Sequence, residues 1–258
     1  GNMGLMESGA GEVKAGFWPQ GPGRSLKWLG RLLLDQLYPP GCAACGAPLQ
    51  SGDGLCATCF AALKPITEPR CPVLGLPFSA DMGPDALSAE ALADPPPFAR
   101  ARAAVAYGKV AGRLVSRMKY GDRPELARLC ARLMIGAWRD FWDKRPLLVP
   151  VPLHASRQRG RRDNQSLLLA QELGRLTGLE VDPLLVRRHR KTRQQVGLSG
   201  DSSKRNVQGA FSAHPDALVR LKGRPVVLID DVYTTGATVK AVTRALKRGG
   251  AETIEILV

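Results

Sequence analysis

Aromatic residues are scarce in this sequence, at 5% of 258 residues, so a folded core must rest on Leu, Val, Ile and Ala. No stretch reaches the roughly 18–20 consecutive apolar residues of a membrane-spanning helix. No apolar segment typical of a secretory signal follows the first residues, so we expect a cytoplasmic protein. The apolar fraction of 44% excludes wholesale disorder.

Acidic residues are also few relative to basic ones. The 23 Asp and Glu residues against 37 Lys and Arg residues give a formal net charge of +14. This excess favours an anionic partner, which could be a phosphorylated small molecule or a nucleic acid.

Four of the six cysteines form two Cys-x-x-Cys pairs with ten residues between them. Such pairs are typical of a zinc site, because each tight turn aims two thiolates at one tetrahedral ion. A disulfide framework lacks a secretory context, and a redox site would need only one pair. We therefore predict a closed, structural Zn²⁺ site made by Cys42, Cys45, Cys56 and Cys59.

The other two cysteines carry less information. Cys71 begins a segment that resembles a third Cys-x-x-Cys-Gly turn, but Leu74 stands at the place of the second cysteine, so its role stays open. Cys130 lies in an apolar helical stripe and is predicted to be a core thiol.

Composition and periodicity divide the chain into four parts. Residues 1–25 are expected to be a tag remnant and a poorly ordered N-terminus, and 26–78 a helix (26–37) followed by the zinc-ribbon segment. Residues 79–97 are expected to be a linker or loop, and 98–258 an α/β domain. Predicted strands (103–107, 147–152, 226–229, 253–258) alternate with predicted helices (111–119, 124–138, 164–176, 238–248), which indicates a parallel sheet.

The most informative segment is 226–238. A strand without polar alternation ends in Asp230 and Asp231, and a loop of small and hydroxyl residues then opens a helix. Unpaired N–H groups at a helix start attract an anion, whereas carboxylates suit ribose hydroxyls or a hydrated Mg²⁺. A phosphate beside a diol and a metal describes a 5-phosphoribosyl group. The candidate ligands in the loop are Thr234, Thr235, Gly236, Ala237 and Thr238.

This segment resembles the phosphoribosyl pyrophosphate (PRPP) motif of type I phosphoribosyltransferases. The resemblance implies that Asp230 and Asp231 contact the ribose hydroxyls and that the loop amides hold the 5-phosphate of PRPP, with Mg²⁺ bound alongside. Together with the paired cysteines and the Lys119-Tyr120-Gly121 and Arg205-Asn206 segments, it makes residues 30–258 similar to the ComF family. Those competence-associated proteins join a zinc ribbon to a Rossmann-like phosphoribosyltransferase domain.

Two arginine-rich segments are candidate pyrophosphate-binding loops. One contains Arg157, Arg159, Arg161 and Arg162, and the other, at 187–193, contains Arg188, Arg190 and Lys191. The resemblance implies that the first binds pyrophosphate and that the second closes over the reacting centre. Nucleic-acid binding and a merely solvated face stay open as alternatives.

Three functions remain at this stage. The chain could be a phosphoribosyltransferase that uses PRPP and Mg²⁺, associated with competence and DNA uptake. It could instead be a non-catalytic accessory that binds single-stranded DNA or competence proteins, or a regulator that senses PRPP or a nucleotide. The sequence identifies neither the acceptor base nor the oligomeric state.

Overall fold

The computed structural model describes residues 41–50, 54–120, 124–137, 144–153, 164–189 and 209–258. By its internal contacts the chain divides into the units 1–40 and 41–258, and all described residues lie in the second. The helix predicted at 26–37 therefore lies outside the described residues, as do Arg157, Arg159, Arg161, Arg162, Arg190 and Lys191.

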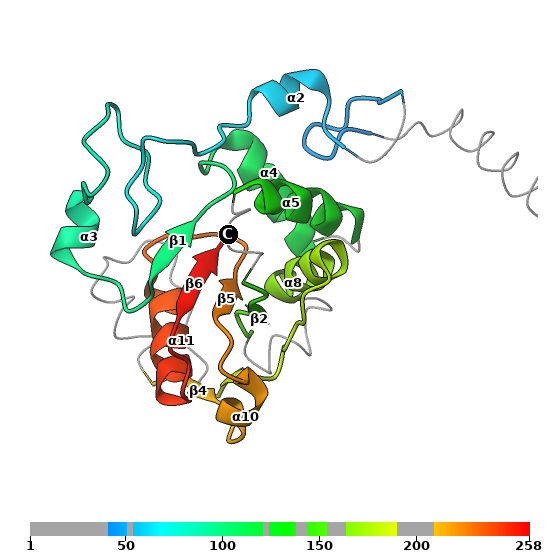
Figure 1. Ribbon diagram of the computed structural model, residues 1–258. Helices are drawn as coiled ribbons and strands as arrows, with labels where there is room; N and C mark the ends of the chain where they lie inside the picture. The colour runs from blue at the N-terminus through cyan, green and yellow to red at the C-terminus, as the bar shows by residue number, and fades with distance from the viewer. Residues whose placement is uncertain (1–40, 51–53, 121–123, 138–143, 154–163, 190–208) are drawn as a thin grey trace, which may run out of the picture. The chain divides into compact units, whose positions relative to one another are not determined.

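A four-stranded parallel sheet forms the centre of the described unit, as predicted (Figure 1). Its strands are β1 (Arg100–Arg102), β2 (Leu147–Pro150), β5 (Val226–Ile229) and β6 (Ile254–Leu257), in the spatial order β1-β6-β5-β2. β5 pairs in parallel with β6 on one side and with β2 on the other. The segment that carries the two adjacent acids thus follows an internal strand.

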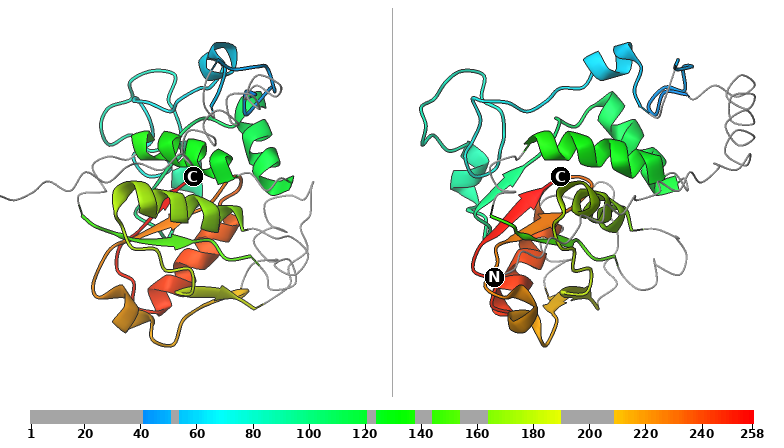
Figure 2. Two further views of the ribbon diagram at one scale, coloured as in Figure 1. Left: turned by 90° about the vertical axis from the view of Figure 1, so that its right-hand side faces the viewer. Right: turned by 45° about the vertical axis from the view of Figure 1, so that its right-hand side comes forward.

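Helices cover both faces of this sheet, which explains why β5 has no polar alternation. Val227 and Ile229 belong to the core made with α4 (Lys109–Tyr120), α5 (Pro124–Ala137) and α8 (Gln165–Thr177). Val226 and Leu228 face the other core, made mainly with α11 (Ala237–Arg248). Figures 1 and 2 show α4 and α5 near the end of β6, which is the end of the chain.

Two smaller elements complete the α/β part. The strands β3 (Val186–Arg188) and β4 (Phe211–Ala213) form an antiparallel pair, and the short helix α10 (Ala217–Leu221) follows. His189 N donates to Ala210 O at 3.0 Å, so the two ends of the segment 190–208 leave from neighbouring positions.

The prediction of a strand at 103–107 was wrong, because the first strand, β1, lies at Arg100–Arg102 instead. Two of its three residues are arginines, so the sequence does not indicate a buried strand here. Arg100 Nε lies 2.9 Å from Glu255 Oε1 on the neighbouring strand, and the buried Arg102 donates from Nη1 to Pro72 O at 3.0 Å. Partners supplied by distant segments therefore place charged side chains in a strand that looks polar in sequence.

The cysteine-rich segment contains two turns of the same construction. In the first, Gly46 N donates to Cys42 O at 2.8 Å and Gly46 has a φ of +80°, so the chain turns back beneath the thiols. In the second, Gly75 N donates to Cys71 O at 2.8 Å and Gly75 has a φ of +68°. Each turn is closed by one antiparallel bridge, Gly41 with Pro48 and Arg70 with Pro77.

A short helix follows each turn and completes the repeat. Cys56 caps α2 (Ala57–Ala61), and its N–H donates to Cys42 Sγ at 3.3 Å. Ser88 likewise caps α3 (Ala89–Ala93), and its N–H donates to Cys71 Sγ at 3.4 Å. The four positions that match Cys42, Cys45, Cys56 and Cys59 are therefore Cys71, Leu74, Ser88 and Ala91. The segment expected to be a linker or loop contains α3.

In each half of this repeat, a main-chain carbonyl oxygen accepts a hydrogen bond from the α/β part. Arg117 of α4 donates from Nη1 to Ala43 O at 2.9 Å, and Ala101 N in β1 donates to Val73 O at 2.7 Å. Cys42, Cys59 and Leu63 belong to the same apolar core as α4, α5 and α8. Among the residues described, no helix has both the length and the apolar character needed to cross a membrane.

Candidate functional site

The candidate site lies at the carboxyl ends of the parallel strands, where open α/β sheets bind their ligands. Asp230 and Asp231 directly follow β5, and Asp230 N still donates to Leu257 O of β6 at 3.2 Å. The chain that leaves β2 runs beside them, since Val151 N donates to Ile229 O at 2.9 Å. The loops that leave β5 and β2 therefore start side by side at one edge of the sheet.

Asp230 is held in place by two donors. Ser166 Oγ, in the first turn of α8, donates to Asp230 Oδ1 at 2.9 Å, and Asp231 N donates to the same oxygen at 3.0 Å. Burial raises the pKa of the Asp230 carboxyl to about 7, and the neighbouring charge of Asp231 adds to this rise. The hydrogen bond from Ser166 and the charge of Lys119 act in the opposite direction.

Asp231 forms an ion pair with a helix on the far side of the site. Its Oδ2 lies 3.0 Å from Nζ of Lys119, in the last turn of α4. The exposed side-chain fractions are 16% for Asp231 and 31% for Lys119, so the pair is partly shielded from water. One of two adjacent negative charges is thereby compensated, and α4 is joined to the loop after β5.

The loop after the acids ends at a helix start that can receive an anion. Gly236 is the N-cap of α11 with a φ of +71°, and no side chain caps the first-turn N–H groups from that position. This φ favours glycine, and a Cβ at Gly236 would also require the Tyr233 side chain to move. Thr234 and Thr235 are exposed, and Ala237 and Thr238 are half-buried. The start of α11 thus combines main-chain N–H donors with the exposed hydroxyls of Thr234 and Thr235.

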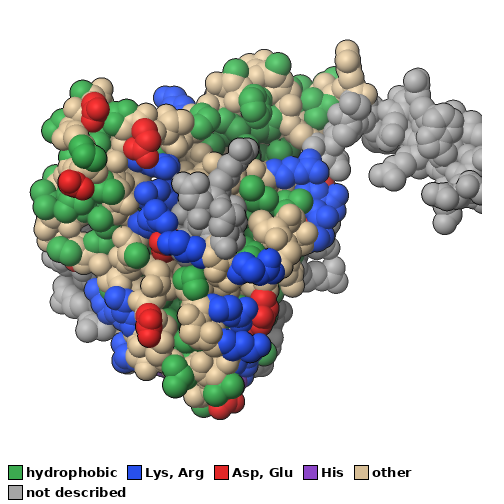
Figure 3. Space-filling view, viewed as in Figure 1, with side chains coloured by type: hydrophobic (Ala, Val, Ile, Leu, Met, Phe, Trp, Pro, Cys, Tyr) green, Lys and Arg blue, Asp and Glu red, His purple; other side chains and the backbone are tan. Residues whose placement is uncertain are grey.

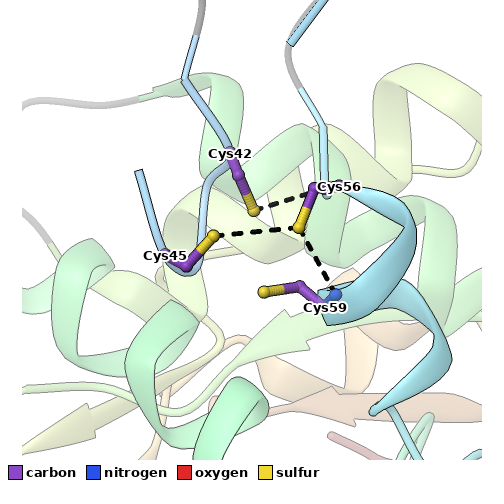
Figure 4. Close-up of side chains that lie close together, drawn as sticks. All are labelled: Cys42, Cys45, Cys56 and Cys59. Carbon is purple, nitrogen blue, oxygen red and sulfur yellow. Dashed lines mark hydrogen bonds between the residues drawn. The ribbon is translucent and has the colours of Figure 1, made fainter. Parts of the chain in front are cut away.

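The structure brings together the four cysteines predicted to bind zinc (Figure 4). Their Sγ atoms all lie within 4.8 Å of one another, and Cys45 Sγ and Cys56 Sγ are 3.7 Å apart. Zinc–sulfur bonds of about 2.3 Å in a tetrahedron put the sulfurs about 3.8 Å apart, so the cluster has the size of a zinc site.

The thiols of this cluster are unequal in acidity. Burial alone would raise the pKa of Cys42, but N–H groups of Cys56, Cys45 and Ala44 outweigh it and hold the pKa at about 6. Burial, contacts with the other three thiols and the charge of Cys42 raise the pKa of Cys59 to about 12. Four adjacent sulfurs cannot all ionise without a cation among them, so the donor set fits a Zn²⁺ ion.

Two family models together match most of the chain. Residues 33–91 match the double zinc ribbon domain, and residues 116–258 match the phosphoribosyl transferase domain. The protein is 34% identical over 227 residues to DNA utilization protein YhgH of Escherichia coli K12, covering 85% of this chain and 96% of that relative. The chain belongs to the ComF family.

Other relatives agree with this assignment. Competence protein F of Haemophilus influenzae is 34% identical over 55% of this chain and 64% of its own, and competence protein ComFC of Bacillus subtilis is 27% identical over 78% and 81%. A solved glutamine PRPP amidotransferase from B. subtilis is 19% identical over 55% of this chain and 30% of its own. Its TM-score of 0.33 is too low to add to the assignment.

Of the basic residues predicted to bind pyrophosphate in this ComF-family chain, the structure describes only Arg188. Its guanidinium carbon lies 5.3 Å from the centre of the Phe211 ring, across the β3–β4 pair. The residues on either side of the segment 154–163 lie close together, because Asn164 Nδ2 donates to Val151 O at 3.1 Å. Figure 3 shows Lys and Arg side chains spread over one face, with fewer acidic ones.

Two residues of the site were missed in the sequence. Lys119 belongs to a segment that carries the ComF resemblance, but nothing in the sequence indicates that it pairs with Asp231, and nothing indicates that Ser166 contacts Asp230. Both reach the acids across long sequence separations, so only the fold reveals them. The one local signal was Asn164, which caps α8 and places Ser166 in its first turn.

Proposed function

We propose that this protein binds PRPP with Mg²⁺ at the segment from Asp230 to Thr238 and transfers its phosphoribosyl group, in a role connected with competence and DNA uptake. One observation carries the proposal. Two adjacent acids at the carboxyl end of an internal parallel strand lead into α11, whose N-cap, Gly236, has no side chain to cap the first turn. Of the N–H groups in that turn, Ala237 N donates to Thr235 Oγ1 at 3.4 Å.

Each group in this arrangement has a partner on PRPP. The 5-phosphate would accept hydrogen bonds from the N–H groups at the start of α11 and from the hydroxyls of Thr234, Thr235 and Thr238. The 2- and 3-hydroxyls of the ribose would donate to Asp230 and Asp231. Lys119 lowers the negative charge that the pyrophosphate must approach, since it already pairs with Asp231.

The carboxylate oxygens of Asp230 and Asp231 are hard ligands, suited to Mg²⁺ or to its bound waters. A bound Mg²⁺ would neutralise charge on the departing pyrophosphate. The arginines of 157–162 and Arg188, Arg190 and Lys191 are proposed to hold the pyrophosphate and to exclude water. No side-chain nucleophile is needed, because the acceptor itself attacks C1 of the ribose.

Calorimetric titration with PRPP and Mg²⁺ tests the proposal. The wild-type chain should bind, and the double variant Asp230→Asn/Asp231→Asn should lose at least tenfold in affinity. A matched control, Asp85→Asn/Asp216→Asn, removes the same charge from two exposed positions and should bind like the wild type. Equal binding by the wild type and the first double variant would refute the proposed site.

A second candidate is binding of single-stranded DNA. It is favoured by the net charge of +14 and by the names of the relatives, which refer to DNA utilization and competence. Tyr107, whose residue surface is 70% exposed, is a candidate for base stacking. Affinity for an oligonucleotide should fall steeply with salt if phosphate contacts dominate, and a flat dependence would exclude this function. The third candidate, a sensor, would bind PRPP without releasing pyrophosphate when an acceptor is present.

A further inference from the structure

A cavity of about 260 Å³ lies beside the proposed phosphoribosyl site. It is lined mainly by α4 and α5, by residues 101–107 at the end of β1, by residues 74–77 of the second turn, and by Asp231–Tyr233. Drug-sized ligands occupy pockets of about 300–1,000 Å³, so this cavity suits a small ring system and not a whole nucleotide.

The side chains that line the cavity are mainly apolar. Among the described residues that line it, only Arg102, Tyr107, Cys130, Asp231 and Tyr233 carry polar side-chain atoms, and the rest are Gly, Ala, Val, Leu, Ile, Met or Pro. Three of the five are engaged, exposed or uncharged. Nη1 of Arg102 donates to main-chain carbonyls, Tyr107 is largely exposed, and burial raises the pKa of the Cys130 thiol to about 11, which keeps it neutral.

The remaining polar groups stand at the end of the cavity nearest the phosphoribosyl site. Asp231 belongs to the acidic pair, and Tyr233 lies over Gly236 at the start of α11. Met118 of α4 lines the cavity and directly precedes Lys119, the partner of Asp231. A ring with its edge towards Asp231 would contact apolar side chains of α4 and α5.

The second turn of the ribbon repeat supplies one wall. Leu74, which stands where the first turn has Cys45, lines the cavity with its apolar side chain. Gly75 follows it, and a Cβ there would come within 2.6 Å of Ala101 O in β1. The turn therefore lies directly against the strand. Exchange of a metal ligand for leucine at this position gives the cavity an apolar wall in place of a thiol.

We propose that this cavity receives the acceptor of the phosphoribosyl transfer, and that the acceptor is a flat, weakly polar nitrogen heterocycle without carbonyl or amino edges. This inference rests on the proposed function. Most side chains of the lining offer no partner to the carbonyl and amino groups of a base with polar edges, so burial of those groups would weaken its binding. An imidazole-type ring has only two hydrogen-bonding groups, which are the nitrogen that attacks C1 and an N–H that can donate to Asp231.

The transfer balances with such an acceptor. The lone pair of its unprotonated ring nitrogen forms a bond to C1 of the ribose. The bond from C1 to the pyrophosphate oxygen breaks, and its electron pair leaves with the pyrophosphate. The proton on the second ring nitrogen passes to water, so no side-chain base is required.

Benzimidazole and hypoxanthine test the proposal, because both are flat and bicyclic but only hypoxanthine has a polar six-membered ring. In calorimetric titrations of the full chain, benzimidazole should bind at least tenfold more tightly. With PRPP and Mg²⁺ present, benzimidazole should also be the better substrate, measured as pyrophosphate release. Equal binding, or tighter binding of hypoxanthine, would overturn the inference.

Variants locate the binding. Ala111→Phe on α4 would fill the cavity and should abolish benzimidazole binding, whereas Arg113→Phe, at an exposed position of the same helix, should not. If Ala111→Phe does not fold, Leu74→Asn serves instead. Its polar side chain in the wall should reduce the ratio between the affinities for benzimidazole and hypoxanthine. Unchanged benzimidazole binding in the folded cavity variant would overturn the inference.

PRPP binding is measured on the same proteins and separates two failures. If PRPP binds and benzimidazole does not, the acceptor inference fails and the proposed function stands. If the wild-type chain binds no PRPP, the proposed function itself fails.

Discussion

Nζ of Lys119 lies 3.0 Å from Oδ2 of Asp231, and this ion pair joins α4 to the loop after β5. The two residues are 112 positions apart in the sequence (231 − 119). The pair compensates one of two adjacent carboxylates, and the charge of Lys119 also opposes the rise in the pKa of Asp230. The ability of the site to keep both acids ionised thus depends on a residue outside the motif.

Replacement of Lys119 by Met should weaken PRPP binding about tenfold at pH 7. Without the ammonium group the pKa of Asp230 rises further, so more of the protein carries a protonated acid that cannot accept two hydroxyl donors. The loss of PRPP affinity in Lys119→Met should be smaller at pH 8.5, where Asp230 is ionised in a larger fraction of the protein. Calorimetry at both pH values measures this, with Lys119→Arg as the control that keeps the charge. Tighter binding by Lys119→Met would mean that the ion pair blocks the site.

Asp230 should make the folded state less stable as the pH rises. Its pKa is raised from 3.8 to about 7, so between these values the folded chain binds more protons than the unfolded chain. The free energy of unfolding contributed by Asp230 therefore falls as pH rises through this window, and it levels off above the folded pKa.

The variant Asp230→Asn lacks this dependence. Between pH 6 and pH 8, its free energy of unfolding should gain about 1 kcal/mol relative to the wild type. Urea unfolding of both proteins with Zn²⁺ present measures the difference, and Asp85→Asn, at an exposed position, should show no such change. If the difference in the free energy of unfolding between Asp230→Asn and the wild type is the same at pH 6 and pH 8, the pKa of Asp230 is not raised.

Gly236→Ala should destabilise the fold by about 1–3 kcal/mol and abolish PRPP binding. The residue has a φ of +71°, and the added methyl group would displace the Tyr233 ring at the start of α11. Gly178→Ala is the matched control, since Gly178 has a φ of +70° with nothing within 4 Å of the added Cβ. The control should lose stability but keep PRPP binding. Loss of binding in both variants would point to general instability.

Each chain should contain one zinc ion, held by the first half of the ribbon repeat. Cys42→Ser or Cys59→Ser should remove the metal, measured by elemental analysis. The second half has the same turn and helix, but Leu74, Ser88 and Ala91 stand at three of the four ligand positions.

The triple variant Leu74→Cys/Ser88→Cys/Ala91→Cys restores a four-cysteine set around Cys71 and should bind a second zinc ion. Two zinc ions in the wild type, or no gain in the triple variant, would contradict the correspondence between the two halves.

Local patterns predicted much of this architecture and the rest depended on distant partners. The run from Val226 to Ile229, covered on both faces, and the glycine at the start of α11 could be recognised because their signals are contiguous. β1 could not, because Arg100 and Arg102 are accommodated by Glu255 and by Pro72 O, far along the chain. The role of Ser166 could not be predicted either, because it contacts Asp230, which lies 64 residues further along the chain.

A crystal structure of the chain with PRPP and Mg²⁺ tests the central claim most directly. The account predicts the 5-phosphate within hydrogen-bond distance of the N–H groups at the start of α11, and the ribose hydroxyls on Asp230 and Asp231. A phosphate bound elsewhere on the basic surface, with the loop from Thr234 to Thr238 empty, would contradict it.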